Sequence, residues 1–357
     1  MSGATVIQGG ARRQKFARLC QRTGVLPWLG ALQSWRGDEL RILAYHRVLD
    51  SAEPEGFTFD LDLVSASQEA FHGQMALVRR KFAPMRFEEV LDYLDRGRKL
   101  PLRAVLGTFD DGYDDNYRMA FPVLRDLDMS AMFFVSTGHI DSGLPYGYDW
   151  LVHMICTAST PRYREPRLGM DIGMPESLEG RRALAAEVLD RLKRLEDAEQ
   201  RRLIAGLECD WDERSAEGHP DCRPMSWDQL REMRRAGMEV GAHSVNHTML
   251  SKVSREEMVR EIEESAEALA RELGERACAM SYPVGGADAY DDVVIDAARA
   301  AGFRMACSYV TGVGNVRTTS LHALPRLPVE REMEMRWFEA MVSLPGVFSY
   351  PVRERDR

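Results

Sequence analysis

The chain has 357 residues, which is long enough to bury a large hydrophobic core as one domain or as a domain with an insertion. Hydrophobic residues make up 45% and charged residues 29%, as in ordinary globular proteins, and the net charge of −9 argues against nucleic acid as the main partner. The six cysteines form no CxxC pair, so they indicate neither a zinc finger nor a disulfide framework and favour a reducing compartment.

Residues 1–40 form a basic and amphipathic segment. Arginines and lysine near its start precede an apolar stretch that contains Trp28 and Trp35. Two interpretations stay open: residues 12–36 make peripheral contact with an anionic membrane surface, or they form a helix packed on the protein's own domain. No secretory signal is recognisable, so we expect a cytoplasmic protein, either free or peripheral at the inner face of the membrane.

From residue 41 to residue 330, strand-like apolar runs alternate with amphipathic helical patterns. We predict strands over 41–48, 104–109, 131–136, 238–242, 277–282, 303–308 and 321–327. We predict helices over 67–82, 87–96, 117–127, 255–273 and 291–301, and another that Ser226 opens. This alternation indicates an α/β fold with a parallel sheet, either a barrel or a doubly wound sheet.

The alternation stops between residues 141 and 225. One helical pattern, over about 181–207, stands in a region otherwise rich in proline, glycine and arginine. We interpret 41–140 and 226–330 as the main domain and 141–225 as an insertion that partly covers one end of it and shapes substrate access. Residues 331–357 are expected to form a C-terminal helix and tail.

The stretch "LGTFDDGYDDN" places two aspartates directly behind the predicted strand 104–109. Asp110 and Asp111 would repel each other at the mouth of a buried strand unless a cation lay between them. Gly112 permits a sharp turn after them. We expect Asp114 and Asp115 to cap the following helix instead.

A second polar motif, "HSVNH", follows the predicted strand 238–242. His243 and His247 are four residues apart, so they share one face if the chain turns helically after the strand. Two imidazoles and one carboxylate suit zinc or a similar divalent ion, and three protein ligands leave one coordination position open. Both motifs are expected at the carboxyl ends of parallel strands, on the same rim.

Together, "TFDDG" and "HSVNH" resemble the two hallmark motifs of the polysaccharide deacetylases, carbohydrate esterase family four. The resemblance covers about residues 41–327 without the insertion, and it implies a distorted parallel (β/α) barrel. It further implies that Asp110 is the general base, and that Asp111, His243 and His247 hold one divalent ion, Zn or else Co, Ni or Mn. The implied reaction removes the N-acetyl group of an N-acetylated saccharide and releases acetate, here from a glycan or a lipid-linked or nucleotide-linked glycan precursor.

The family's third motif, R-x-P-[FY], is altered in this chain. The corresponding stretch is "SYPVGG", which keeps Pro283 but has no arginine. Pro283 suggests the same turn, and the N–H near Val284 is a candidate oxyanion donor. Arg326 either replaces the missing guanidinium near the base or forms a surface ion pair.

Two histidines compete for the role of general acid. His322 is late in the chain, where most family members have it, whereas His46 in "ILAYHRV" has the better local pattern but precedes the aspartates. The early position is similar to the permuted barrels of some biofilm poly-N-acetylglucosamine deacetylases, and we favour His46. The other interpretation of His46 is a core histidine.

Aromatic residues near the motifs are candidates for stacking on sugar rings. These are Tyr113, Trp150, Tyr282 and Tyr290, although such residues more often belong to the core or the rim. Two other function classes stay open: a metal-dependent phosphodiesterase, which usually needs two metal sites, and a carbohydrate-binding member that has lost catalysis.

Overall fold

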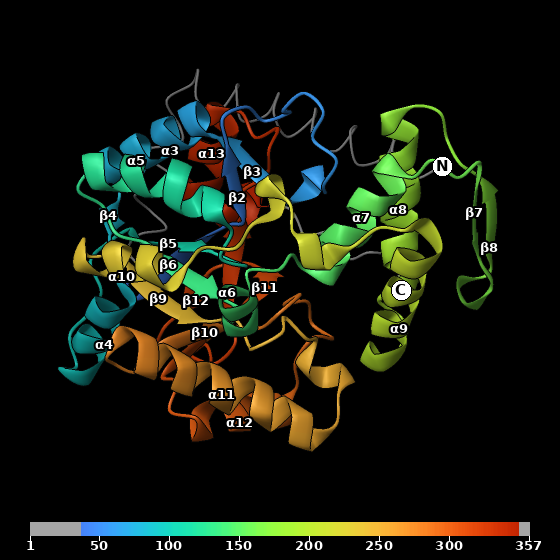
Figure 1. The fold of residues 1–357 in the computed structure, drawn as a ribbon. Helices are drawn as coiled ribbons and strands as arrows, with labels where there is room; N and C mark the ends of the chain where they lie inside the picture. The colour runs from blue at the N-terminus through green and yellow to red at the C-terminus, as the bar shows by residue number, and fades with distance from the viewer. Residues whose placement is uncertain (1–36, 350–357) are drawn as a thin grey trace.

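The computed structural model describes residues 37–349. Within them, seven parallel strands close into a barrel, and their order around the barrel is their order along the chain (Figure 1). They are β1 (Glu39–Tyr45), β5 (Ala104–Phe109), β6 (Met132–Val135), β9 (Glu239–Ala242), β10 (Ala279–Ser281), β11 (Met305–Thr311) and β13 (Leu324–Pro328). The last strand, β13, pairs in parallel with β1, which also pairs with β5. This closure confirms the barrel and excludes the doubly wound sheet.

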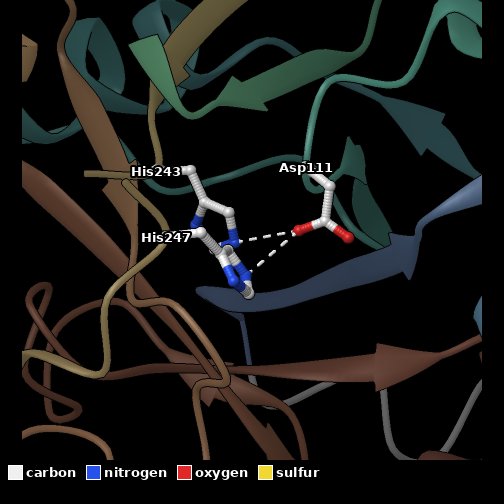
Figure 2. Close-up of side chains that lie close together, drawn as sticks. All are labelled: Asp111, His243 and His247. Carbon is white, nitrogen blue, oxygen red and sulfur yellow. Dashed lines mark ion pairs between the residues drawn. The ribbon is translucent and has the colours of Figure 1, made fainter. Parts of the chain in front are cut away.

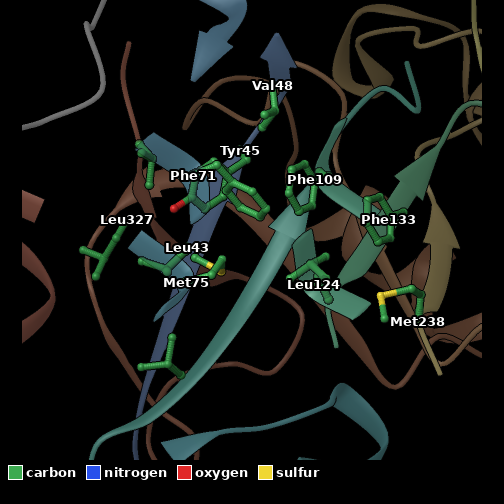
Figure 3. Packing of buried hydrophobic residues seen from close by; sticks show 14 of the residues in the cluster. Leu43, Tyr45, Val48, Phe71, Met75, Phe109, Leu124, Phe133, Met238 and Leu327 are labelled. Carbon is green, nitrogen blue, oxygen red and sulfur yellow. The ribbon is translucent and has the colours of Figure 1, made fainter. Parts of the chain in front are cut away.

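Alternation along the strands separates the barrel interior from its outer surface. In β1, Leu40 and Ile42 belong to the inner cluster, whereas Leu43 and Tyr45 belong to the larger outer one. Figure 3 shows part of the outer cluster, where Tyr45 and Phe109 pack against Phe71 of the neighbouring helix. The strands therefore read as continuously apolar in sequence because both of their faces are covered.

Helices surround the strands at the positions that the sequence predicts. They are α3 (Gln68–Lys81), α4 (Phe87–Asp95), α5 (Phe121–Asp126), α10 (Trp227–Arg235), α11 (Arg255–Leu273), α12 (Asp292–Ala300), α13 (Met335–Ser343) and α14 (Pro345–Phe348). Side chains of Ser67, Ser226 and Ser254 accept N-terminal N–H groups and start three of them. Buried residues of α4 join the inner cluster, so this helix closes the amino end of the barrel.

The insertion builds a small helical unit beside the barrel (Figure 1). It contains α7 (Gly147–Thr157), α8 (Leu178–Leu192), α9 (Asp197–Trp211) and an antiparallel hairpin of β7 (Arg162–Glu165) and β8 (Met170–Gly173). The prediction of one helix over 181–207 is wrong, because the chain leaves α8 after Leu192 and α9 begins only at Asp197. The unit has a hydrophobic cluster of its own, to which Trp150 belongs.

Several short elements complete the described chain. They are α6 (Thr137–Ser142), a two-stranded parallel sheet of β2 (Arg47–Leu49) and β3 (Val64–Ser67), and the short barrel-edge strands β4 (Ala83–Pro84) and β12 (Gly314–Asn315). The strand predicted over 41–48 is thus two strands, and His46 lies at the break. The proposed membrane segment, residues 12–36, lies outside the described residues. Among residues 37–349, no helix has both the length and the apolar composition needed to cross a bilayer.

Candidate active site

The two aspartates leave β5 at the carboxyl end of the barrel, in a tight turn. Asp111 and Gly112 both have left-handed backbone conformations, with φ of 74° and 76°. A Cβ atom at Gly112 would lie 2.8 Å from Val135 Cγ1, so glycine is required here for space as well as conformation. Both carboxylates are buried, and the turn points them in different directions: Asp111 toward the histidines and Asp110 toward β13.

His243 and His247 lie on an irregular loop after β9, and the helical turn that would put them on one face does not form. Ser244 and His247 have φ of 61° and 56°, which no helix allows. The loop is held by Glu261 of α11, whose carboxylate accepts the N–H groups of Val245 (2.9 Å) and Asn246 (2.8 Å) and the Asn246 side-chain amide (2.6 Å). The buried Glu261 therefore supplies the order that a helix would have supplied.

The loop brings both imidazoles to Asp111, as Figure 2 shows. Oδ1 of Asp111 lies 3.4 Å from Nε2 of His243 and 3.3 Å from Nε2 of His247. His243 donates its Nδ1–H to the carbonyl oxygen of Ser281 (2.8 Å), which leaves Nε2 with a free lone pair.

These three side chains fit a divalent metal ion. Asp111 Oδ1 is fully buried yet makes no hydrogen bond of acceptable geometry, so it is an unsatisfied acceptor in the protein alone. Two ligand atoms that each lie about 2.1 Å from a tetrahedral ion are about 3.4 Å apart, which agrees with the separations here. Among the described residues, Asp111, His243 and His247 form the one group of three or more such side chains with metal-binding spacing.

The electrostatics of Asp111 also favour its anionic form. Burial by itself raises the pKa of this carboxyl, but the adjacent imidazoles of His243 and His247 outweigh burial and hold the pKa well below its usual range. A carboxylate that stays ionised is ready to serve as a ligand.

Asp110 forms a bidentate ion pair with Arg326 of β13. Nη1 donates to Oδ1 (2.8 Å) and Nη2 donates to Oδ2 (2.6 Å), and both side chains are almost completely buried. The surface ion pair considered for Arg326 is therefore wrong, and the guanidinium lies beside Asp110, as its predicted replacement role requires. Burial raises the pKa of Asp110, but Arg326 and then His243 lower it to a net value below the usual one.

Ser281 and Tyr309 belong to this site although sequence reasoning gave them no role. Ser281 Oγ accepts from Arg326 Nη2 (3.0 Å), while its carbonyl oxygen accepts from His243. The Tyr309 ring lies edge-on to His46 at 5.2 Å between centroids and near the Arg326 guanidinium at 5.3 Å. The signal that could have marked them is their position near the carboxyl ends of late strands, Ser281 in β10 and Tyr309 in β11.

The two candidate acids lie at different ends of the barrel. His46 follows β1 directly, and the pairing of Tyr45 with Phe109 brings it level with Asp110; its charge acts on both Asp110 and Asp111. His322 precedes β13, and its Nε2 donates to the carbonyl oxygen of Phe303, just before β11. His322 is therefore remote from the metal ligands, because amino ends of strands face the opposite rim.

Three of the aromatic residues predicted to stack on sugars, Tyr113, Trp150 and Tyr282, are buried, and for these three the prediction is wrong. Tyr113 donates its OH to Asp149 of the insertion (2.6 Å), Trp150 packs within the insertion core, and the Tyr282 OH donates to the carbonyl oxygen of His322 (2.8 Å). Tyr113, Trp150 and Tyr282 are respectively 1%, 4% and 1% exposed. Their rings stabilise the fold, because burial removes their apolar surface from water.

Two further predictions concern the turns around the site. Asp114 and Asp115 do not cap the helix: Asp114 pairs with Arg118 and Gln229, and Asp115 pairs with Arg47. Pro283 and Val284 lie in the turn after β10, next to Ser281. Val284 has a left-handed backbone (φ 63°), but its role as an oxyanion donor stays a prediction.

A comparison with family models matches residues 97–306, more than half of the chain, to the family described as polysaccharide deacetylase. The chain belongs to the polysaccharide deacetylase family. The matched range includes Asp110, Asp111, His243 and His247, but it leaves out β1 and β13. The positions of His46 and Arg326 therefore rest on the structure.

Individual proteins agree with this assignment. The poly-β-1,6-N-acetyl-D-glucosamine N-deacetylase of Escherichia coli K12 is 29% identical over 104 residues, which is 29% of this chain and 15% of that protein. The enzyme of the same name from Staphylococcus aureus MSSA476 is 30% identical over 105 residues, 28% of this chain and 36% of that one. The chain thus spans well under half the length of these relatives.

The fold is also similar to a solved structure, the Streptococcus pyogenes deacetylase PplD in complex with acetate. The TM-score is 0.56 at 18% identity, and the match covers 87% of this chain and 99% of that one. At this identity the likeness establishes the fold of the barrel.

Proposed function

We propose that this protein hydrolyses the N-acetyl group of an N-acetylated amino sugar in a glycan or glycan precursor, using one divalent metal ion. The observation that carries the proposal is the division of labour between adjacent aspartates. Asp111 faces two imidazoles with an unsatisfied oxygen, whereas Asp110 is turned away to Arg326. One carboxylate is thereby available as a ligand and the other as a base.

A divalent ion held by Asp111, His243 and His247 would supply Lewis-acid polarisation of the acetyl carbonyl and of water. Asp110 accepts a proton from the water that attacks the carbonyl carbon, and Arg326 keeps this carboxylate ionised and oriented. The Val284 N–H is the proposed donor to the oxygen that gains charge, a contribution of about 3 kcal/mol for one such donor.

His46 is the proposed general acid. A sugar amine is a poor leaving group unless its nitrogen receives a proton as the C–N bond breaks, and histidine carries and releases protons readily near neutral pH. The products are acetate and the free amino sugar. The relatives from Escherichia coli and Staphylococcus aureus, named for deacetylation of poly-β-1,6-N-acetyl-D-glucosamine, support an acetylated glucosamine polymer or its precursor as substrate.

The test is to incubate the purified protein with β-1,4-linked and β-1,6-linked N-acetylglucosamine oligomers and measure acetate. Metal-loaded protein should release acetate, and a chelator should stop the release. Bis(p-nitrophenyl) phosphate and metal analysis test the phosphodiesterase alternative. About one ion per chain with acetate release supports the deacetylase; two ions with phosphate-ester cleavage, or oligomer binding without acetate, would reject it.

A further inference from the structure

We infer that Asn116 and Ser65 are positioning residues that hold His46 where it can donate a proton to the leaving nitrogen. The inference rests on the proposed function of His46. It concerns the break between β1 and β2, where the His46 backbone lies outside both strands. Its N–H and C=O therefore need partners other than strand neighbours.

Two buried side chains satisfy this backbone. The His46 N–H donates to Ser65 Oγ (2.9 Å), and the His46 carbonyl oxygen accepts from Asn116 Nδ2 (2.7 Å). Ser65 is 3% exposed and Asn116 is 0% exposed. Both backbone polar groups of His46 are therefore fixed by hydrogen bonds from different segments of the chain.

The next two residues are held in the same way. Oδ2 of Asp115 accepts from Arg47 Nε (2.9 Å), its Oδ1 accepts from the Val48 N–H (3.2 Å), and Arg47 and Asp115 form a buried ion pair. Asn116 also donates to Asp115 Oδ1 (3.2 Å), which connects the two clamping side chains. The segment from His46 to Val48 is thus fixed to the segment 115–116.

That clamping segment is continuous with the catalytic turn. Asp110 and Asp111 lie five residues before Asp115 and Asn116, and Asn116 begins a π-helical turn that leads into α5. A π-turn often marks a functional position, because it redirects side chains that an α-helix would turn outward. One stretch of chain therefore sets the base, a metal ligand and the backbone of the proposed acid relative to one another.

The ring of His46 receives its remaining constraint from Tyr309, whose edge packs against it. With its backbone polar groups bonded to Ser65 and Asn116 and its ring in contact with Tyr309, His46 is held near one orientation. Precise placement matters because a displacement of about 1 Å can reduce catalysis on the order of a hundredfold.

The experiment compares Asn116→Ala and Ser65→Ala with Asp126→Ala, an exposed position on α5. Against an N-acetylglucosamine oligomer, Asn116→Ala should lower kcat at least tenfold with KM within about twofold, and should retain one metal ion per chain. Hydrolysis of 4-methylumbelliferyl acetate, whose leaving group needs no proton, should change less than twofold. Equal losses on the amide and on the ester would overturn the inference.

A double-mutant cycle distinguishes an effect through His46 from a general disturbance of the active site. In a His46→Ala background, adding Asn116→Ala should cause no further loss of kcat, because its effect acts through His46. If the double variant instead shows the product of the two single-variant reductions in kcat, the inference is contradicted. If Asn116→Ala does not fold, Ser65→Ala, which removes one oxygen, takes its place in the same cycle.

A spectroscopic measurement separates this inference from the proposed function. In ¹H–¹⁵N spectra of the imidazoles, Asn116→Ala and Ser65→Ala should shift or broaden the His46 signals and leave those of His72, exposed on α3, unchanged. Wild-type protein that releases no acetate would reject the proposed function alone, while unchanged His46 signals would reject the positioning role.

Discussion

The guanidinium of Arg326 reaches Asp110 from 216 positions further along the chain. It does so where other family members are expected to use an arginine of the third motif, which this chain lacks. What the reaction needs is a buried, planar cation that binds both carboxylate oxygens, and its strand of origin does not matter. The ion pair therefore supports the prediction that Arg326 takes the place of the third-motif arginine.

Asp110→Asn tests the division of labour between the aspartates. The amide cannot accept the proton from water, so kcat should fall about a hundredfold to ten-thousandfold. Metal content should stay near one ion per chain, since Asp110 faces Arg326 and not the histidines. Elemental analysis beside acetate kinetics checks this, and loss of the metal would mean that the two aspartates have exchanged roles.

His46→Ala and His322→Ala form a matched pair of histidine deletions. His46 lies level with Asp110 at the carboxyl rim, whereas His322 bonds to Phe303 at the other end of the barrel. We expect His46→Ala to bind metal normally and to lose about a hundredfold or more in amide hydrolysis. His322→Ala should keep kcat within a few-fold of wild type. The reverse ranking would show that the acid is His322 after all.

At the scale of elements, buried carboxylates order the loops and helix ends of the barrel. Glu261 of α11 accepts three hydrogen bonds from the loop that carries His243 and His247. Glu239 of β9 accepts the first N–H groups of α4 and so caps that helix. In both cases a buried carboxylate supplies acceptors to N–H groups that no regular element satisfies. The loop geometry is thus a property of the helix behind it.

Glu261→Ala should weaken metal binding about tenfold to a hundredfold, as is usual when a group that orients metal ligands is removed. The reason is that Val245 and Asn246 lose their acceptor and His247 is no longer held in its left-handed conformation. Competition with a chromogenic chelator measures the affinity. Glu264→Ala, an exposed substitution on the same helix, is the control, and equal affinities in the two variants would contradict the role.

Glu239 should make stability depend on pH. Burial raises its pKa to about 7, although the N–H groups of Phe87 and Glu88 partly oppose this. Between about pH 4.5 and 7 the unfolded chain has released this proton and the folded chain has not, so stability falls as pH rises by about 3 kcal/mol in total. Below this pH range Glu239 is protonated in both states and does not change the free energy of unfolding with pH. Above the range it is ionised in both states, so the loss of stability stays constant.

Urea unfolding of wild type and Glu239→Gln across pH 4.5 to 8 checks this prediction. The wild-type free energy of unfolding should decline relative to that of the variant as pH rises through the window. A difference that does not vary with pH would show that Glu239 is ionised in the folded protein.

For the whole molecule, barrel closure is what assembles the site. The proposed metal ligands follow β5 and β9, Arg326 of β13 pairs with the proposed base, and the proposed acid follows β1. Parallel strands present their carboxyl ends on one rim, so residues spread over almost 300 positions converge there. Binding of a metal ion at this site should therefore be linked to folding.

Zinc should stabilise the native protein. At a free concentration a hundredfold above the dissociation constant, the free energy of unfolding should rise by about 2.7 kcal/mol. His243→Ala should lose this increment, whereas His72→Ala on the exposed side of α3 should retain it. Thermal or urea unfolding with and without the ion measures the effect, and an equal response of His243→Ala would place the metal elsewhere.

The sequence by itself determined the features that depend on neighbouring residues. The strand 104–109 and the helix 255–273 were predicted with their observed bounds, because apolar periodicity and capping residues act locally. Asp110, Asp111, His243 and His247 were also expected together, since the carboxyl ends of parallel strands share one rim. The histidine at the end of the first strand also indicated a permuted barrel, and this stays a prediction.

Only the tertiary structure decided which distant groups meet. Residue type does not tell whether an aromatic ring is core or sugar platform, and Tyr113 and Tyr282 proved to be core. Sequence spacing also does not reveal that Glu261 orders the loop between His243 and His247, or that Asn116 donates a hydrogen bond to the His46 carbonyl oxygen. These contacts join segments that are far apart in the sequence, so local patterns do not predict them. A buried polar group has no access to water and must bond to whichever group the folded barrel places beside it.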